Sequence, residues 1–477
     1  MGGFIYGLAV VLVIFEGIIT ECEGTGGAGI AGCSECHLKQ LPNDIITKFV
    51  QDMSINEKID YVKDVIGKKL TPDPFTSNIL QNSIILINIG NATEDEGFHV
   101  NYEHGIYFVR FDHFEILMSF FEKCGKQVKR IHINIDWDSM NESNQEKFVQ
   151  NIFKTHAKQI EELQIKILND EGFWEKMSNG GKDIKFPQVK KFQITGESKK
   201  KEFNLNFIFP NMTSFGLFGN VTDSDCLAEV TRLEELILHT KSIPELKIGE
   251  IFKKNNKIEK LSLSWVEEAQ TMYSIATHLP KLEKFTVEFP GNDFLFQTDS
   301  QVHELRSVTH LNISFTETMQ QIGIGIGKLS FNMPILKKLI LNSVLADCQV
   351  VNFIKKFKKL EIVEFSAKKN SKVVDCIREL KHIKEFTIFF ENKYEFSYQV
   401  SNLMRIFKKS DKTSTLQIVK FENVHDWSYI SYEGEIKFTN NFLRENGKPT
   451  WTLSRKQIGE SLLNLTYERD PEHPNFA

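Results

Sequence analysis

Apolar and polar positions along the chain repeat in one short pattern: an apolar residue, two variable residues, an apolar residue, one variable residue and an apolar residue. Twelve copies occur between Val128 and Phe421, with starts 21 to 33 residues apart. In a short strand, the fourth and sixth positions point the same way, while the residues between them face solvent. One such unit cannot bury its apolar side alone, but stacked units share a continuous core. The pattern therefore predicts an α/β solenoid with a curved parallel sheet inside and helices outside.

The copies are, by their three apolar positions, Val128/Ile131/Ile133, Ile160/Leu163/Ile165, Val189/Phe192/Ile194, Met212/Phe215/Leu217, Leu233/Leu236/Leu238, Ile258/Leu261/Leu263, Leu282/Phe285/Val287, Val308/Leu311/Ile313, Leu336/Leu339/Leu341, Leu360/Val363/Phe365, Ile383/Phe386/Ile388 and Leu416/Val419/Phe421. Two earlier matches, Ile84/Ile87/Ile89 and Ile106/Val109/Phe111, extend the series toward the N-terminus. Between copies, segments such as "GEIFKKNNKIEKL" and "VVDCIRELKHIKEF" carry apolar residues at helical spacing and should form the outer helices.

This strand pattern resembles the leucine-rich-repeat family over residues 80–424. The Asn that many members carry after the strand is mostly missing: Asn220 fits, but the equivalent places elsewhere hold Lys241, Val266, Pro290 and Thr316. Turn chemistry should therefore vary between repeats, and the curvature should be irregular. The Cys-rich flanking caps of extracellular members are also absent from the sequence, which indicates the intracellular branch of the family.

The N-terminus has a different pattern. Residues 4–15 are continuously apolar, a length too short to span a bilayer and typical of the core of a signal peptide. We expect a signal peptide over residues 1–22, despite the lack of Lys or Arg before the apolar run, and a Gly-rich linker over residues 23–40. No later segment is long and apolar enough to cross a membrane. The seven cysteines are few for a secreted chain of this length.

Residues 41–75 carry apolar residues at three- and four-residue steps, which predicts short helices. The segment is similar to the F-box motif: Leu41-Pro42 matches its opening, and "VIGKK" (65–69) falls near its closing cluster, with Ile66 where Cys is usual and no Trp following. The resemblance implies docking on a Skp1-type adaptor through Leu41, Pro42, Ile45, Ile46, Phe49, Met53, Ile59, Val62 and Val65. An amphipathic cap for the repeat stack is the alternative.

An F-box followed by leucine-rich repeats resembles the substrate receptors of cullin-RING ubiquitin ligases. Together with a signal peptide, this order is similar to a family of secreted salivary effectors of gall midges such as the Hessian fly. The resemblance implies a protein, secreted and delivered into the host cell cytoplasm, that binds the host Skp1 adaptor and recruits a target for ubiquitination without catalysing a reaction itself. The alternative is a secreted leucine-rich-repeat recognition protein without a role in ubiquitination.

Solenoids use the concave sheet for recognition because its side chains lie on closely spaced, rigid strands. Phe218, Ile237 and Ile340 are apolar where solvent is expected, so they are either anchors for a protein target or scattered surface hydrophobes. The full predicted target-binding set is Lys191, Gln193, Phe218, Ile237, His239, Ser262, Lys284, Thr286, His310, Asn312 and Ile340, with Ser264 and Lys338 also expected to point outward. Asn312 begins one of six glycosylation sequons, and a glycan there would block this face.

The sequence gives little support for nucleic-acid binding, phosphate binding, metal or haem binding, or catalysis. A net charge of -5 gives no electrostatic case for a nucleic-acid partner. "GIGIGKLS" (323–330) lacks the first Gly and the final Ser or Thr of a phosphate-binding loop. "CSECH" (33–37) fits a haem attachment or half a zinc site, but no second ligand pair accompanies it, so a local disulfide or free thiols are favoured. We expect no catalytic residue, metal or cofactor, and a C-terminal cap over residues 425–477.

Overall fold

The chain divides into two units, residues 1–79 and 80–477. The computed structural model describes residues 80–89, 97–102, 105–110, 114–167, 173, 184–196, 205–219, 229–240, 245–264, 269–289, 303–315, 331–342, 348–367, 380, 382–390, 417–425, 443–444, 451–457 and 462–469. All of them belong to the second unit. The predicted signal peptide, Gly-rich linker and F-box-like segment lie outside the described residues, as does "GIGIGKLS" (323–330).

The described strands are β1 (Ile84–Ile89), β2 (Gly97–Tyr102), β3 (Gly105–Arg110), β4 (Arg130–Ile135), β5 (Glu162–Ile167), β6 (Lys191–Gly196), β7 (Ser214–Phe218), β8 (Glu235–His239), β9 (Lys260–Leu263), β10 (Lys284–Phe289), β11 (His303–Glu304), β12 (His310–Phe315), β13 (Phe331–Asn332), β14 (Lys338–Leu341), β15 (Ile362–Ala367), β16 (Glu385–Phe390), β17 (Ile418–His425), β18 (Trp451–Gln457) and β19 (Leu462–Arg469). The helices are α6 (Phe114–Cys124), α7 (Glu142–Phe148), α9 (Leu205–Ile208), α11 (Glu245–Lys254), α12 (Ala269–His278) and α14 (Cys348–Lys355), with 3-10 turns η3 (Gly125–Gln127) and η4 (Trp137–Ser139) and a π-helical turn η5 (Val149–Lys154).

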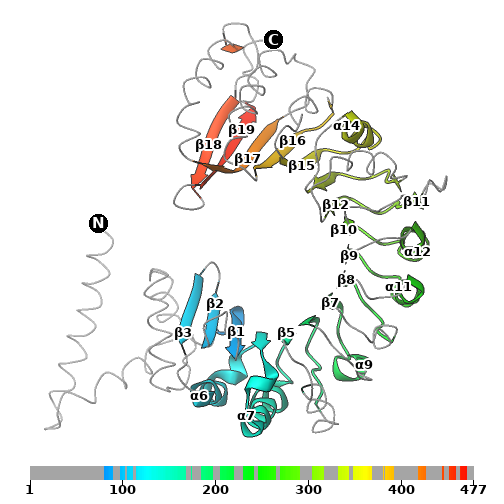
Figure 1. Ribbon diagram of the computed structural model, residues 1–477. Helices are drawn as coiled ribbons and strands as arrows, with labels where there is room; N and C mark the ends of the chain where they lie inside the picture. The colour runs from blue at the N-terminus through cyan, green and yellow to red at the C-terminus, as the bar shows by residue number, and fades with distance from the viewer. Residues whose placement is uncertain are drawn as a thin grey trace, which may run out of the picture. The chain divides into compact units, whose positions relative to one another are not determined.

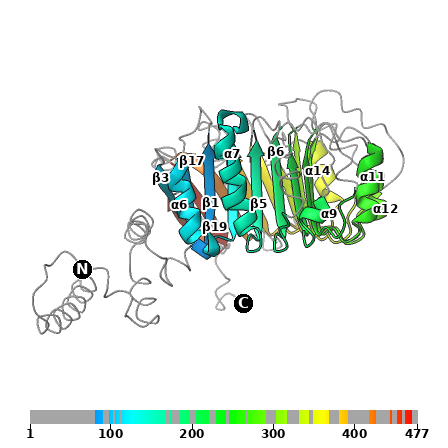
Figure 2. The same ribbon diagram turned by 90° about the horizontal axis from the view of Figure 1, so that it is seen from below.

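Seventeen of these strands form one sheet, and β11 pairs with β13 in a second, parallel pair. From β1 through β4 to β10, and on through β12, β14, β15 and β16 to β17, every neighbouring pair is parallel. The described helices lie on one side of this sheet (Figures 1 and 2). We call the opposite side the concave face, since the wider helical layer of a solenoid lies outside its sheet. The predicted α/β solenoid architecture is thus present in the described residues.

The repeat pattern predicts the strand register. Ile131 pairs with Leu163, Leu163 with Phe192, and the same position continues strand by strand to Val419 on β17. The first apolar position is buried in every described copy, from Val128 to Ile383, and so is the fourth position. The sixth is buried wherever its side chain is described, except at Ile194, which is partly exposed. Each repeat therefore places the same three side chains into one shared core.

The two early matches do not fit as predicted. Ile85, rather than Ile87, pairs with Ile131, so the repeat frame on β1 begins two residues earlier than the pattern indicated. Apolar residues fill nearly every position of β1, so the template fits it in more than one register. The second match falls on β3, which runs antiparallel to β2, and β2 runs antiparallel to β1. Alternation alone carries no information about strand direction, so the pattern does not distinguish the strands of this hairpin from repeat strands.

At the other edge of the parallel run, β19 pairs antiparallel with β17, and β18 pairs antiparallel with β19. Both strands come from the segment for which we expect a C-terminal cap. Pairing of this kind leaves neither terminal repeat strand with an open row of backbone groups, which would otherwise be a template for aggregation.

Aromatic side chains fill the layer between sheet and helices. Phe186 stacks on Phe209 at 5.3 Å between ring centroids, Phe209 on Phe192 at 4.3 Å, and Phe192 approaches Phe215 at 5.9 Å. These rings come from successive repeats, so they join neighbouring repeats through the core. Most phenylalanines in the described part of the chain are buried in this way, although Phe207 is 46% exposed and Phe218 is partly exposed.

The helix predicted in "GEIFKKNNKIEKL" (249–261) is confirmed only in its first part: α11 begins earlier, at Glu245, and ends at Lys254, just before a buried asparagine, Asn255, and the segment's last two residues belong to β9. The side-chain oxygen of Asn255 accepts from Leu233 N at 3.0 Å, and its amide nitrogen donates to Val230 O at 2.8 Å and to Ile251 O at 2.9 Å. One buried side chain thus fixes the turn after α11 to the segment that enters β8. Most of the other predicted helix, "VVDCIRELKHIKEF" (373–386), lies outside the described residues, and its last two residues, Glu385 and Phe386, belong to β16 rather than to a helix.

Candidate functional site

Each strand has two core positions, the fourth and sixth of the repeat pattern. The residue before the first of them, the residue between them and the residue after the second face the concave side, so these residues form three rows across the sheet. The first row runs Arg130, Glu162, Lys191, Ser214, Glu235, Lys260, Lys284, His310, Lys338, Ile362, Glu385. The second runs His132, Gln164, Gln193, Gly216, Ile237, Ser262, Thr286, Asn312, Ile340, Glu364, Thr387. The third includes Phe218 and His239, which pair on β7 and β8. Neighbours within a row are about 4.8 Å apart, the spacing of paired strands.

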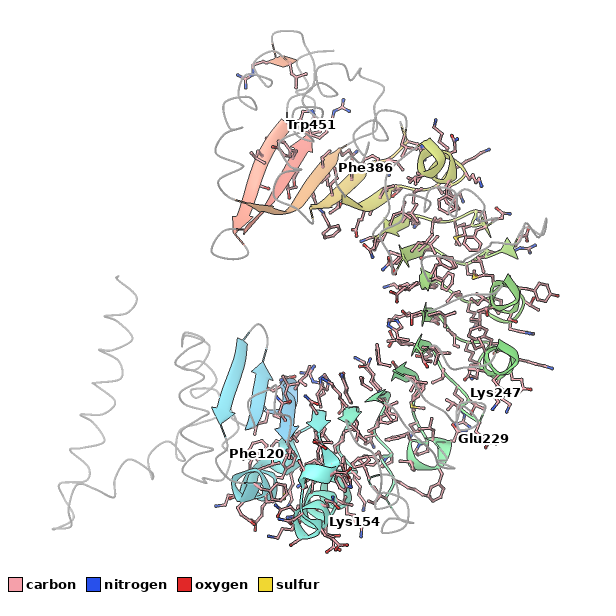
Figure 3. The ribbon with its side chains drawn as sticks, viewed as in Figure 1. Phe120, Lys154, Glu229, Lys247, Phe386 and Trp451 are labelled. Atoms are coloured by element: carbon pink, nitrogen blue, oxygen red, sulfur yellow. The ribbon has the colours of Figure 1, made fainter. Side chains whose placement is uncertain are left out.

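All eleven predicted target-binding residues lie in these rows, and none is buried. Figure 3 labels Lys154 and Lys247 on the helical side of the sheet, and Phe386 on β16, where it is one of the buried core positions. The prediction that Ser264 points outward is wrong. Ser264 is 7% exposed, and its hydroxyl is buried without a hydrogen-bond partner among the described residues. It directly follows the last residue of β9, where the chain leaves the sheet and the alternation of the strand no longer holds.

Phe218, His239 and Ser262 are brought together by three adjacent strands. The rings of Phe218 and His239 meet edge to face, with centroids 5.1 Å apart, and His239 Nε2 shares a hydrogen bond of 2.8 Å with Ser262 Oγ. Burial lowers the pKa of His239, while Glu288 acts in the opposite direction, so the ring is neutral at pH 7. Ile237 lies on the same strand as His239. Together, Phe218, Ile237, His239 and Ser262 form the Phe218 cluster.

Two glycines allow this packing. A Cβ on Gly216 would lie 2.9 Å from Gln193 Cγ and 3.2 Å from Phe218 Cε2, so the missing side chain leaves room for the phenylalanine ring. Gly219 follows Phe218 with a φ of 104°, and a Cβ there would lie 2.5 Å from Gly196 O in the neighbouring turn. Neither glycine was recognised from the sequence. Each is required by a close contact with a neighbouring strand, and the contacting residues, Gln193 and Gly196, lie 23 residues earlier in the chain. Ile340 lies on β14, with β10 and β12 between it and β9, so it is not part of the Phe218 cluster.

Toward both ends of the sheet, charged side chains on the concave face pair across strands. Glu162 accepts from His132 Nε2 at 3.3 Å and from Lys191 Nζ at 3.0 Å. The hydrogen bond from His132, followed by the contact with Lys191, lowers the pKa of Glu162 to about 2, although burial opposes the shift. Further pairs join Lys338 to Glu364 at 2.7 Å and Lys420 to Glu385 at 2.5 Å. His132, Glu162 and Glu364 were not among the predicted site residues, although they occupy the same repeat positions as residues that were: Glu162 lies in the first row, and His132 and Glu364 lie in the second.

The middle of the sheet has a different charge pattern. Lys260, Lys284 and His310 are exposed first-row neighbours on β9, β10 and β12, and none forms an ion pair with another described residue. The pKa of His310 is lowered, first by partial burial and then by the positive charges of Lys284 and Lys338, while Glu283 opposes the shift. We call Lys260, Lys284 and His310 the basic row. One residue before each of β8, β9 and β10 stands an exposed glutamate, Glu234, Glu259 or Glu283, and we call these the acidic row.

Three of the sequon asparagines have described side chains. Asn141 is exposed and caps α7 by accepting from Asn144 N at 2.9 Å. Asn211 is exposed and donates to Pro187 O at 2.8 Å. Asn312 lies in the second row, partly buried, and accepts from Asn342 Nδ2 at 3.0 Å. A glycan on Asn312 would therefore cover the middle of the concave face, whereas one on Asn141 would lie at the start of a helix.

Within the described residues, no group of three His, Cys, Asp or Glu side chains is arranged to hold a metal ion. Cys124 is buried, and burial raises its pKa to about 11, so this thiol is not activated as a nucleophile. None of the described helices has the length and apolar character to cross a membrane.

No protein-family model and no curated protein matches the chain. Among solved structures, an internalin, InlF, from Listeria monocytogenes matches at 14% sequence identity and a TM-score of 0.32, over 72% of this chain and 86% of its own. TLR13, solved in a complex with ssRNA13, matches at 13% identity and a TM-score of 0.33, over 56% of this chain and 41% of its own. Both likenesses are low; the repeat architecture is established by the strand register and the buried repeat positions.

Proposed function

We propose that this protein is a non-catalytic binding protein that holds a protein target on the concave face of its sheet. The observation that carries the proposal is the in-register array of outward rows, most of whose side chains are at least partly exposed, on strands whose other side packs into the core. Such strands hold their side chains in fixed positions, which reduces the entropy lost on binding. The Phe218 cluster supplies an apolar anchor beside polar groups, a combination favoured at protein interfaces.

We further propose that residues 41–75 dock on a Skp1-type adaptor, so that the bound target is presented to a ubiquitin ligase. Support comes from the sequence alone: Leu41-Pro42, the apolar spacing that follows, and the position of this segment directly before the repeats. In such an assembly the ubiquitin-transfer chemistry belongs to other subunits, and this chain contributes positioning. The apolar leader supports secretion, and we propose that the protein acts in the cytoplasm of a host cell.

A binding measurement with purified Skp1 tests the adaptor proposal. The full chain is mixed with plant and with insect Skp1, and complex formation is followed by size-exclusion chromatography with light scattering. We expect a complex with one of them that is lost in the variant Leu41→Ala plus Pro42→Ala. A matched control, Leu70→Ala plus Pro72→Ala, changes the same residue types at the end of the segment and should keep the complex. Absence of a complex with either Skp1 rejects the adaptor role and leaves a secreted recognition protein.

A further inference from the structure

His156 is a buried histidine on the helical side of the sheet, with 2% of its surface exposed. It lies between the π-helical turn η5 and β5, and its ring meets that of Phe121 on α6 with centroids 5.8 Å apart. A π-helical turn is uncommon and often occurs at functional sites. The ring also lies against Gly125, because a Cβ added there would overlap the imidazole. His156 therefore packs directly against the segment that enters the preceding strand, β4.

The side chain of Gln159 fixes the protonation state of this ring. Gln159 Nε2 donates to Gly125 O at 2.8 Å and lies 2.8 Å from His156 Nδ1. A carbonyl oxygen can only accept, so the amide of Gln159 must present its nitrogen to Gly125, and its second N–H is left for Nδ1. Nδ1 is therefore the acceptor, and the single proton of the neutral imidazole is on Nε2. We call Gly125, His156 and Gln159 the His156 latch.

A second proton on the ring would break this arrangement. Protonated Nδ1 is a donor, and it would face the N–H of Gln159, which is also a donor. Turning the amide over would place Gln159 Oε1 beside Nδ1, but also beside Gly125 O, where two oxygens repel one another. Because neither orientation of the amide satisfies both neighbours, the hydrogen bonds of the latch require a neutral ring.

The charges around His156 do not favour its protonated form either. Burial lowers the pKa of His156, a hydrogen bond with the backbone of Phe121 opposes the shift, and the positive charge of Lys126 on η3 lowers the pKa further. Cys124 on α6 is an uncharged thiol, since burial raises its pKa to about 11. The other charged groups of the adjoining elements are exposed: Glu115, Glu122 and Lys123 on α6, Glu142, Glu146 and Lys147 on α7, Lys154 on η5 and Lys158 beside the ring. None of these carboxylates contributes to the shift.

We propose that the His156 latch is an acid-sensitive connection between α6 and η5, which opens as the pH falls through the range in which histidine gains a second proton. Above pH 6.5, the ordinary pKa of histidine, the ring is neutral in both the folded and the unfolded chain, so the latch is fully formed. Below that pH the unfolded chain takes up the proton more readily than the folded protein. Stability is therefore lost as the pH falls toward and through the lower pKa of the folded state. The latch needs neither a bound target nor Skp1, so it goes beyond the proposed function.

Hydrogen–deuterium exchange of the full chain, read by mass spectrometry at about pH 7.5 and about pH 5, tests the latch. Rates are first corrected for the pH dependence of chemical exchange. We expect peptides within residues 114–128 and 148–160 to exchange at least about threefold faster at the lower pH, because the protonated ring favours the open form. Peptides from α11, which is remote from His156 in the sequence, are the reference within the same sample and should change by less than about twofold.

Two variants separate a titrating latch from ordinary packing. His156→Asn does not titrate and can keep an oxygen acceptor near the position of Nδ1, so it should show no acid acceleration, although it is less stable at both pH values. Gln159→Glu places a carboxylate next to Nδ1, where it pairs with the protonated ring, so the acid acceleration should be absent or reversed. His278→Gln, at a partly exposed histidine at the end of α12, is the matched control and should keep the wild-type response.

Three results would overturn the proposal: no acid acceleration near His156 in the wild type, equal acceleration in α11, or acceleration that persists in His156→Asn. The comparison of segments within the wild type needs no variant, so it remains decisive if His156→Asn does not fold. Gln159→Glu then gives a second test, because acceleration that persists in this variant contradicts protonation of the ring as the cause.

Discussion

Replacement of Asn255 by Ala should destabilise the repeat stack more than any exposed substitution nearby. The change removes three hydrogen bonds, to Leu233 N, Val230 O and Ile251 O. Ile251 O still accepts from the backbone nitrogen of Asn255 at 3.0 Å, so it keeps a partner. Leu233 N and Val230 O have no other bond to a described residue, and both residues are buried. Two buried backbone groups are therefore left unpaired.

The magnitude follows from those two groups. Each buried donor or acceptor left without a partner costs about 1–3 kcal/mol. Partial entry of water into the space left by the amide reduces the sum, so we expect a loss of about 2–4 kcal/mol in the free energy of unfolding. Asn255→Asp keeps the acceptor for Leu233 N but loses both donated bonds and buries a carboxylate beside Val230 O and Ile251 O, so at neutral pH it should destabilise at least as much as Asn255→Ala.

Equilibrium unfolding in urea, followed by far-ultraviolet circular dichroism, measures the effect. Asn256 is the matched control, because it is the same residue type at the next position and is exposed. Asn256→Ala should change stability by less than about 0.5 kcal/mol, as is usual at exposed sites. If the two alanine variants lose the same small amount, the hydrogen bonds of Asn255 do not support the turn and the reasoning is wrong.

Three further predictions follow from the concave face and its turns. The pKa of Glu162 in the folded protein is about 2, below its ordinary value of 4.5, so the stability that its ionised form contributes is present above pH 4.5 and lost as pH falls toward 2. Urea unfolding from pH 6 to 2 should show that the free energy of unfolding of Glu162→Gln falls by about 1–2 kcal/mol less than that of the wild type, a figure discounted for solvent screening. Gly219→Ala should destabilise by about 1–3 kcal/mol because of its φ of 104°, whereas Gly249→Ala, inside α11 with its nearest contact at 3.4 Å, should stabilise by up to about 1 kcal/mol in thermal melts. In secreted native material, peptide mapping after deglycosylation should find Asn312 unmodified and glycan at exposed Asn141; a glycan on Asn312 would contradict use of the concave face for binding.

The repeat pattern predicted the core well because it depends on local chemistry alone. Residues at the first, fourth and sixth positions, such as Leu233, Leu236 and Leu238, are buried in every described copy except at Ile194. It failed on β1, where the run of isoleucines fits two frames and pairing with β4 decides between them. It failed on β3 because strand direction is set by the hairpin with β2 rather than by side-chain pattern.

The candidate site was predictable in part. Alternation was enough to identify the outward residues, but their contacts depend on which residues of distant repeats stand opposite one another. Glu162 and Lys191 are 29 residues apart, and their ion pair follows only from the register of β5 and β6. The role of Asn255 was missed for a related reason. Asparagine was expected after the strand, whereas this buried asparagine follows an outer helix and bonds to the preceding repeat.

The two sides of the sheet contribute unequally to stability, and this explains how the fold tolerates the neighbouring lysines of the basic row. Core positions, the phenylalanine stack and buried groups such as Asn255 lie between the sheet and the helices, so they hold the repeats together from that side. The concave rows contribute partly exposed ion pairs between strands, such as Lys338 with Glu364, and each is worth about 1 kcal/mol. Repulsion between Lys260 and Lys284 is correspondingly small, because both are exposed and screened by water and salt. Substitutions in these rows should therefore leave the fold intact, so that a change in target binding reports on recognition rather than on unfolding.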